Sequence, residues 1–268
     1  MSLSLVGRIG AVILAGSTFL VACNNAGAAD VQAPVKAPPV PAPLGAWSFE
    51  FSPYLWAAGI KGDVALGPMA PLVGVDVGFD TILKHLHMTF MGVFEARYEQ
   101  WGLIADISYL SERVPATGPL GFVNAKLEDK TFFGTFAAAY RIVDQRTFWI
   151  DAVAGGRAWW RSDTLNITAP GPVGLSISRD KSWFDPIIGV RARTYATPQL
   201  FFQAYADVGG FGVGAKSDWQ LAGLIGYDYN KTVTFFGGYR YLAVNYDRGG
   251  YVFDVALSGP VLGATFRF

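Results

Sequence analysis

The chain has 268 residues, and its 21 lysines and arginines balance its 21 aspartates and glutamates, so the formal net charge is zero. Without a basic surplus or an acidic run, nothing indicates nucleic-acid binding or a disordered acidic chain. Charged residues make up 16% against the roughly 25% usual in soluble domains, while aromatic residues reach 15%. The chain therefore lacks the charge to coat a soluble surface, and a soluble lipocalin-type barrel is disfavoured because its outward positions would have to be polar.

The chain begins with the pattern of a secretory signal peptide. Arg8 precedes an apolar run from Ile9 to Ala22. This run is shorter than the roughly 20 residues that a membrane-spanning helix needs. Small residues follow, and cleavage after Ala28 or Ala29 makes residues 1–29 the predicted signal peptide.

A second processing route stays open at the lone cysteine. Residues 20–23 resemble a lipoprotein box, in which Cys23 would become the acylated N-terminus. Ordinary cleavage is favoured because small-residue sites are tolerant and a barrel needs no lipid anchor. Cys23 then leaves with the signal, which excludes disulfide and cysteine–metal chemistry. The Pro/Ala-rich segment 30–46 is predicted to be an extended periplasmic leader.

After the leader, polarity alternates with the two-residue period of strands. In Met88–Tyr98 the even positions are mostly apolar or aromatic, and the odd ones include Glu95 and Arg97. Trp101–Tyr109 repeats the pattern, with aromatic residues near both ends as interfacial girdles require. Because nothing after the signal is apolar for long enough to form a membrane helix, these segments predict a transmembrane β-barrel over 47–268.

The predicted fold class is all-β, an antiparallel up-and-down barrel of about ten strands. The strands are expected at 47–58, 86–99, 101–113, 122–142, 146–163, 177–196, 199–209, 214–229, 231–246 and 250–268. The short turns that join some of them should face the periplasm, at residues 99–100, 144–145, 197–198 and 230–231. In the long connection 59–85, segments 61–66 and 72–79 can pair as a hairpin. If that hairpin joins the wall the barrel has twelve strands, and eight strands is the third option.

One irregularity is expected in the last strand. Val255 and Leu257 share the odd parity, whereas Leu262 shares the even parity with the residues that follow it. A change of phase is therefore predicted at Gly259-Pro260, since proline lacks the ladder donor and glycine tolerates a bulge.

The end of the chain carries a candidate insertion signal. The residues on one face of the last strand are Leu262, Ala264, Phe266 and Phe268. This pattern resembles the C-terminal signal by which bacterial outer-membrane β-barrels are recognised and inserted. The predicted location is the cell outer membrane. The predicted partners are outer-membrane lipid and, through the C-terminal strand, the barrel-assembly machinery, with no nucleic acid and a monomeric state.

Residues 47–268 resemble a family of small outer-membrane β-barrel proteins of Gram-negative bacteria, broadly akin to the opacity and OmpA-like barrels. The motifs that carry the resemblance are Pro53-Tyr54-Leu55-Trp56-Ala57, Phe90-Met91-Gly92, Glu95-Ala96-Arg97, Trp101-Gly102-Leu103, the run 207–214, Gly238-Tyr239-Arg240-Tyr241-Leu242 and Gly259-Pro260. The resemblance implies the fold and the location. It implies no catalytic residue, and the chain departs from the family at His85 and His87, where acidic or amide residues are usual.

Charged side chains fall on the inward parity of the predicted strands, because each would cost roughly 2–4 kcal/mol on a lipid face. The predicted lumen charge network comprises Glu50, Glu95, Arg97, Asp106, Asp151, Arg157, Arg191, Arg193, Asp207, Arg240 and Arg267. Arginine–carboxylate forks can plug the lumen and hold the wall together. Alternatively, the charges line a pore that slightly favours anions. The plug is favoured, since ten strands leave little free lumen once Trp149, Trp159 and Tyr205 also occupy it.

His85 and His87 are the only histidines and the only candidates for an enzymatic base or a metal pair. A solvated pair beside Lys84 is the favoured interpretation, because no nucleophile motif or metal-ligand cluster accompanies them. No catalytic residue, cofactor or metal is predicted. The glycine-rich run 209–214 precedes an alternating strand rather than a helix, so it predicts an extracellular turn and no phosphate site.

The sequence thus predicts a non-enzymatic outer-membrane barrel with a charged lumen, which has an envelope-structural role and room to pass small solutes. A small-solute porin is the first alternative. A lipid- or peptide-acting enzyme, and a surface adhesin acting through the 59–85 connection, are the others.

Overall fold

The computed structural model describes residues 45–68, 72–79, 86–117, 124–168 and 174–268. The predicted signal peptide and nearly all of the predicted leader lie outside the described residues. The described chain forms one sheet with the strands β1 (Trp47–Trp56), β2 (Gly59–Leu66), β3 (Val73–Val77), β4 (Leu86–Tyr98), β5 (Trp101–Thr117), β6 (Asn124–Asp144), β7 (Phe148–Thr168), β8 (Gly174–Tyr195), β9 (Leu200–Gly209), β10 (Ser217–Asp228), β11 (Val233–Arg248) and β12 (Tyr251–Arg267). No helix in these ranges is long and apolar enough to cross a membrane.

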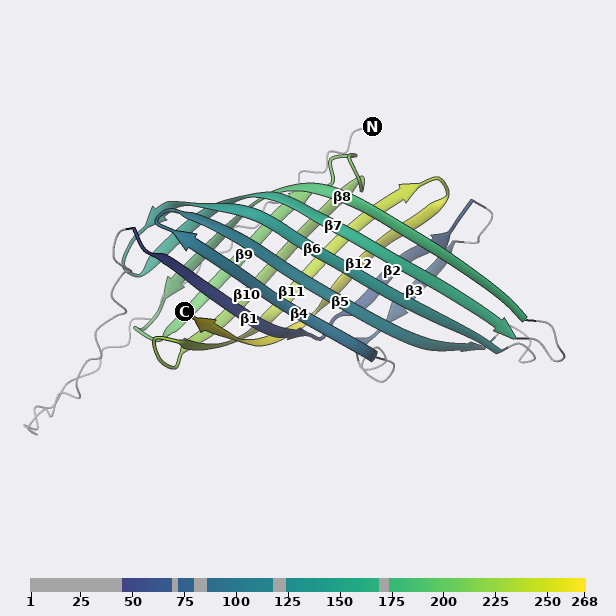
Figure 1. The fold of residues 1–268 in the computed structure, drawn as a ribbon, viewed down its shortest axis with the longest axis horizontal. Helices are drawn as coiled ribbons and strands as arrows, with labels where there is room; N and C mark the ends of the chain where they lie inside the picture. Colours follow the sequence, from purple (N-terminus) through teal and green to yellow (C-terminus); the bar gives the residue numbers. More distant parts are fainter. Residues whose placement is uncertain (1–44, 69–71, 80–85, 118–123, 169–173) are drawn as a thin grey trace, which may run out of the picture. The chain divides into compact units, whose positions relative to one another are not determined.

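Ten of these strands close into a barrel (Figure 1). β1 pairs with β4, each strand from β4 to β11 pairs with the next in the chain, and β12 pairs with β1. The antiparallel up-and-down order is confirmed, and the eight-strand alternative is wrong. The expected hairpin exists as β2 and β3, but it attaches to one end of β12 and lies outside the closed ring. Twelve wall strands is therefore wrong as well.

β1 and β2 follow one another along β12, with a short break between them. β1 ends at Trp56 and β2 begins at Gly59, yet both pair with β12 in one continuous register. The break lies opposite Gly259, where an added Cβ would sit 1.8 Å from the carbonyl oxygen of Ala57. The glycine is required by this close approach of two backbones.

The predicted change of phase at Gly259-Pro260 is wrong. The β11–β12 ladder runs without a register shift from Val233↔Phe266 to Arg248↔Tyr251. Val255 is 3% exposed and belongs to the buried core, whereas Leu262 is 68% exposed on the outer face. Both the inward and the outward positions of β12 carry apolar residues, because the barrel interior around Tyr251, Phe253 and Val255 is itself apolar.

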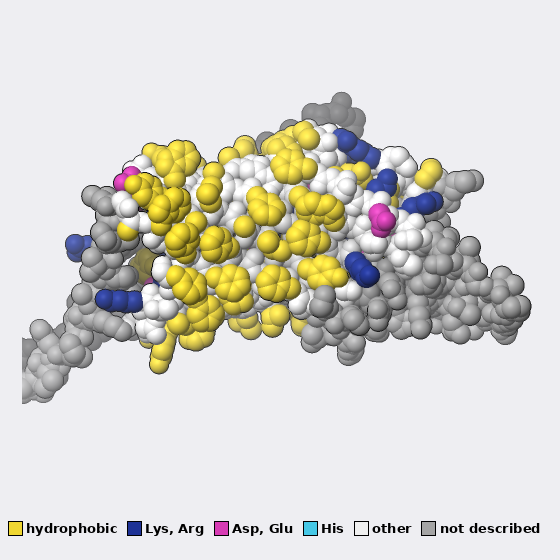
Figure 2. Space-filling view, viewed as in Figure 1, with side chains coloured by type: hydrophobic (Ala, Val, Ile, Leu, Met, Phe, Trp, Pro, Cys, Tyr) yellow, Lys and Arg dark blue, Asp and Glu magenta, His cyan; other side chains and the backbone are white. Residues whose placement is uncertain are grey.

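On the side of the barrel that Figure 2 shows, apolar side chains form a belt across the wall strands. Its aromatic residues mark two levels, with Trp101 and Tyr140 near one rim and Trp160 and Phe184 near the other. Between these levels, the outward positions of the described wall strands carry no charged residue. From Phe148 to Trp160 the belt spans about 30 Å, taking a rise of about 3.3 Å per residue and a tilt of about 40°. That height matches a bilayer's hydrocarbon core.

The two rims of the barrel differ as expected. The four short turns predicted from the sequence join β4–β5, β6–β7, β8–β9 and β10–β11, all at the rim where β12 ends. At the opposite rim, β6, β7 and β8 contain 21, 21 and 22 residues and extend well beyond the 10-residue β9. Short turns face the periplasm in such barrels, so the long strands project outward from the cell. The run 209–214 lies in the β9–β10 connection on that outer side, as predicted.

Candidate functional site

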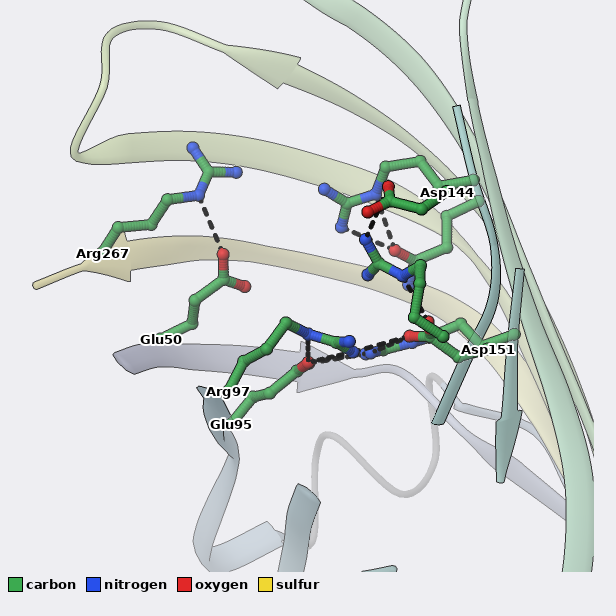
Figure 3. Close-up of polar contacts among 10 residues, drawn as sticks. Glu50, Glu95, Arg97, Asp144, Asp151 and Arg267 are labelled. Atoms are coloured by element: carbon green, nitrogen blue, oxygen red, sulfur yellow. Dashed lines mark hydrogen bonds and ion pairs between the residues drawn. The ribbon is translucent and has the colours of Figure 1, made fainter. Parts of the chain in front are cut away.

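The inward side chains form ordered layers along the barrel axis, and the first complete layer lies near the periplasmic rim (Figure 3). Arg191 on β8 donates to both carboxylate oxygens of Glu95 on β4, at 2.7 and 2.9 Å, and to Asp151 on β7 at 2.8 Å. Arg97 donates to the same two carboxylates, at 2.9 and 2.7 Å. Two cations and two anions thus link three strands across the lumen.

Further arginines surround Trp149 in this layer. Arg141 donates to Asp151 at 2.6 Å, and its guanidinium lies 4.2 Å from the Trp149 ring centre. The guanidinium of Arg193 lies 5.2 Å from the same ring and 4.0 Å from that of Phe201. Stacking on aromatic faces thus supplements the carboxylate contact of Arg141, and it holds Arg193, which has no carboxylate partner among the described residues.

The periplasmic mouth carries a smaller ion-pair group. Arg267 on β12 donates to Glu50 on β1 at 2.9 Å (Figure 3). It also donates to Asp228 on β10 at 3.0 Å. The Glu50 side chain is 31% exposed, so solvent screens this group more than the layers above it.

The middle of the lumen contains a group of buried charges. Arg157 on β7 is fully buried and pairs with Asp207 on β9 at 2.7 Å and with Asp218 on β10. It also donates to Thr135, and the Trp159 indole donates to Asp218 at 3.1 Å. Nearby, Arg240 on β11 bridges Asp106 of β5, Tyr54 of β1 and Gln220 of β10.

An aromatic stack fills the barrel above these charges. Phe133, Trp159, Trp183 and Tyr246 stack in series, with ring centres 4.6, 5.5 and 4.2 Å apart. The Trp159 and Phe253 ring centres are 6.1 Å apart. β7 and β12 carry these two residues and lie on opposite sides of the ten-strand ring, so the stack reaches from wall to wall.

A last charged group lies beyond the aromatic stack. Arg161 on β7 pairs with Asp163 at 2.7 Å and with Asp129 of β6. Tyr251 on β12 donates to Asp163 at 2.9 Å, which again joins opposite walls. The group is level with the outward Lys130, beyond the Trp160 level of the belt, and so lies outside the membrane-spanning part of the wall.

Loss of hydration raises the pKa of Asp129 to about 7, while hydrogen bonds from its partners lower that of Asp163. Because the folded chain binds the Asp129 proton more tightly than the unfolded chain does, the folded state loses stability as Asp129 ionises. This loss occurs as the pH rises from about 4 to about 7. We expect Asp129→Asn to remove part of the fall in stability between pH 5 and 8. The midpoint of heat-induced unfolding on gels measures this change. Asp180→Asn, on an exposed aspartate of β8, is the control and should leave the pH dependence as it is; equal slopes for D129N and wild type would contradict the prediction.

A cavity of about 160 Å³ separates the mouth from the Arg157 layer. Its lining includes the polar residues Glu50, Ser52, Tyr54, Glu95, Asp106, Thr135, Arg191, Arg193, Gln203, Tyr205, Gln220, Arg240 and Thr265. This volume holds a small solute or several waters. It ends at the buried Arg157 layer.

All eleven residues of the predicted lumen charge network lie on inward faces, and ten of them form ion pairs. Arg193 is the exception, since it contacts Gln203 and aromatic rings instead. The sequence reasoning missed Asp129, Arg141, Asp163, Asp218 and Asp228. The last two share the parity of Gln220 in β10, so alternation could have found them. Arg141 lies beside a register shift that breaks the pattern.

The remaining predicted site residues are placed as follows. The insertion-signal residues lie on the outer face of β12 and just after it, where Leu262 is 68% and Phe268 78% exposed. His85 lies outside the described residues, and of His87 only the backbone, in β4, is described. Within the described ranges, no group of three or more histidine, cysteine or acidic side chains is arranged to hold a metal ion.

Comparison with known proteins supports the fold. The chain is similar to the crystal structure of the outer-membrane protease OmpT from Escherichia coli, with a TM-score of 0.50 and 8% identity over 83% of this chain and 97% of that one. It also matches Ail of Yersinia pestis (TM-score 0.36, 13% identity, 83% and 98% covered) and the toluene transporter TodX of P. putida (TM-score 0.32, 11% identity, 84% and 90% covered). No family model and no curated protein sequence matches.

A closed ten-strand barrel with an uncharged belt of bilayer height, and a fold shared with an outer-membrane protein, place the chain in the cell outer membrane. The apolar belt faces outward, and the layered interior contains the charges.

Proposed function

We propose that the protein is a non-enzymatic, closed outer-membrane barrel that supports the envelope mechanically. The observation that carries this proposal is contact between opposite walls. Trp159 of β7 packs on Phe253 of β12, and Tyr251 of β12 hydrogen-bonds Asp163 of β7. Such contacts make the interior a packed core rather than a channel.

The ion pairs below the stack support the same proposal. Arg157, Asp207 and Asp218 are each buried, and together they join β7, β9 and β10 through the lumen. A selectivity lining needs charges that a passing ion can reach. Charges that pair with one another and are shielded from water instead fix the relative positions of the strands.

Planar bilayer recording tests the proposal. The purified, folded protein should show no discrete conductance steps in salt solution, at protein amounts that give a clear folded band on gels. A detergent-only bilayer is the control. Discrete, reproducible steps from the wild-type chain would favour the small-solute porin instead.

We further propose that the barrel-assembly machinery recognises the outer face of the last strand. Phe266 and Phe268 lie on this face, 37% and 78% exposed. Phe268→Ala is expected to reduce the folded protein in the outer-membrane fraction several-fold, without changing unfolding of the molecules that do assemble. Phe235→Ala, which removes a 54%-exposed outward aromatic from β11, is the control. Equal losses for the two variants would remove the special role of the chain end.

A further inference from the structure

The cavity at the periplasmic end of the lumen contains a guanidinium that no carboxylate neutralises. Among the described residues, Arg193 pairs with no acidic side chain. Its Nε and Nη2 both donate to the side-chain oxygen of Gln203, at 2.9 and 2.6 Å. The rings of Trp149 and Phe201 lie against its guanidinium at 5.2 and 4.0 Å. Gln203 and the two rings therefore hold the Arg193 guanidinium in place, and its Nη1 makes no hydrogen bond within the part of the chain that the structure describes.

The other charges around the cavity compensate one another. Glu50 pairs with Arg267 at the mouth, and Asp106 pairs with Arg240 at the upper end. Glu95 receives hydrogen bonds from both Arg97 and Arg191, as described above. The described cavity lining contains three arginines and three carboxylates, and Arg193 is the one of these six that has no direct partner of opposite charge among the described residues.

The unused hydrogen-bonding groups are donors as well. Because the oxygen of Gln203 accepts two bonds from Arg193, its amide nitrogen is left to donate into the cavity. The amide nitrogen of Gln220 is left to donate as well, since the Gln220 side-chain oxygen accepts from Arg240 Nε and Nη2 at 3.0 and 2.6 Å. Arg191, which is 9% exposed, has an Nε without a partner among the described residues. Surplus donors beside a preorganised cation suit an oxygen anion.

We propose that this cavity binds a small oxyanion, a carboxylate or a phosphate, that enters from the periplasm and is held by Arg193 and Gln203. The volume of about 160 Å³ admits such an ion with some of its water. The lining reaches Glu50 at the mouth, which gives the entry path, and the Arg157 layer closes the other end. A barrel that is closed to passage can thus still present a binding pocket to the periplasm.

Calorimetric titration of the folded, detergent-solubilised full chain tests the site, with inorganic phosphate and acetate as probes and chloride as the reference anion. We expect saturable binding of phosphate or acetate, weakened at least tenfold in Arg193→Gln. Arg146→Gln, which removes an exposed arginine from the β6–β7 turn at the same rim, should bind as the wild type does.

A second variant covers the case in which R193Q fails to fold. Gln203→Glu places a carboxylate on Arg193 and should fold well while abolishing oxyanion binding, because Arg193 then has an internal carboxylate partner. Unchanged binding in the folded Q203E variant would overturn the proposal. So would wild-type binding no tighter for phosphate or acetate than for chloride, or equal losses in R193Q and R146Q. Bilayer conductance tests the closed barrel separately, so either proposal can fail alone.

Discussion

Trp159→Ala is expected to lower the free energy of unfolding by about 3–5 kcal/mol, the range for removing a large aromatic from a packed core. Trp159 is fully buried, contacts Phe133, Trp183 and Phe253, and donates its indole proton to Asp218. The cavity and the lost hydrogen bond act together. Denaturant unfolding in lipid or detergent, followed by tryptophan fluorescence and gel mobility, measures the loss.

A double-mutant cycle separates a bridge across the lumen from a local packing defect. Phe253 lies on the opposite wall, so W159A and F253A should show a coupling energy of about 0.5–3 kcal/mol. The double variant is also expected to conduct where the wild type does not. Trp101→Ala, on a 60%-exposed lipid-facing residue, is the matched control and should cost far less. Additive effects of W159A and F253A, or a silent double variant in bilayers, would contradict the wall-to-wall plug.

Alternation predicted the wall of this barrel well. The strand positions and short turns follow from a period of two and from local turn residues, both of which are properties of neighbouring positions. The inward parity of Arg157 and Asp207 follows from the cost of a charge in lipid, which holds at any point on the belt. Strand positions, short turns and inward parity depend on neighbouring residues and on the lipid around the barrel, so one sequence is enough to predict them.

Which inward side chains pair across the lumen could not be predicted from alternation. Glu95 meets Arg191, 96 residues away, because β4 and β8 face one another in a ring of this size. Strand number and stagger decide which inward residues meet, and alternation specifies neither.

The misassigned phase of β12 has a related cause. An alternating pattern shows that two faces differ, and a lipid-facing apolar residue looks the same as one that fills the lumen. Phe253 and Val255 are inward and buried, and their apolar character reflects the aromatic plug. A sequence rule that treats the interior as polar throughout fails where the barrel contains its own core.

Arg157→Ala is expected to destabilise the barrel by about 3–5 kcal/mol, the cost of leaving partners of a buried ion pair uncompensated. The substitution strands two buried carboxylates, Asp207 and Asp218, in a region without water access. Lys216→Ala provides the contrast, because its pair with Asp247 is exposed and should contribute no more than about 1 kcal/mol. Unfolding midpoints of the two variants, compared in one detergent, measure the difference. Unchanged melting of R157A together with a new pore would contradict a structural role for this ion group.

The ranking of the stability losses among variants of Arg157, Asp207 and Asp218 gives a stricter test than the size of any one loss. Asp218 accepts hydrogen bonds from both Arg157 and Trp159, whereas one carboxylate oxygen of Asp207 has no partner among the described residues. Asp207→Asn should therefore cost less than Asp218→Asn, and both less than R157A. The triple variant R157M/D207N/D218N removes the three charges of this group together and should recover much of the stability lost in R157A, since neither carboxylate of the group is then left buried without its cation. If the triple variant is as unstable as R157A, the loss comes from packing around the Arg157 side chain rather than from its charge.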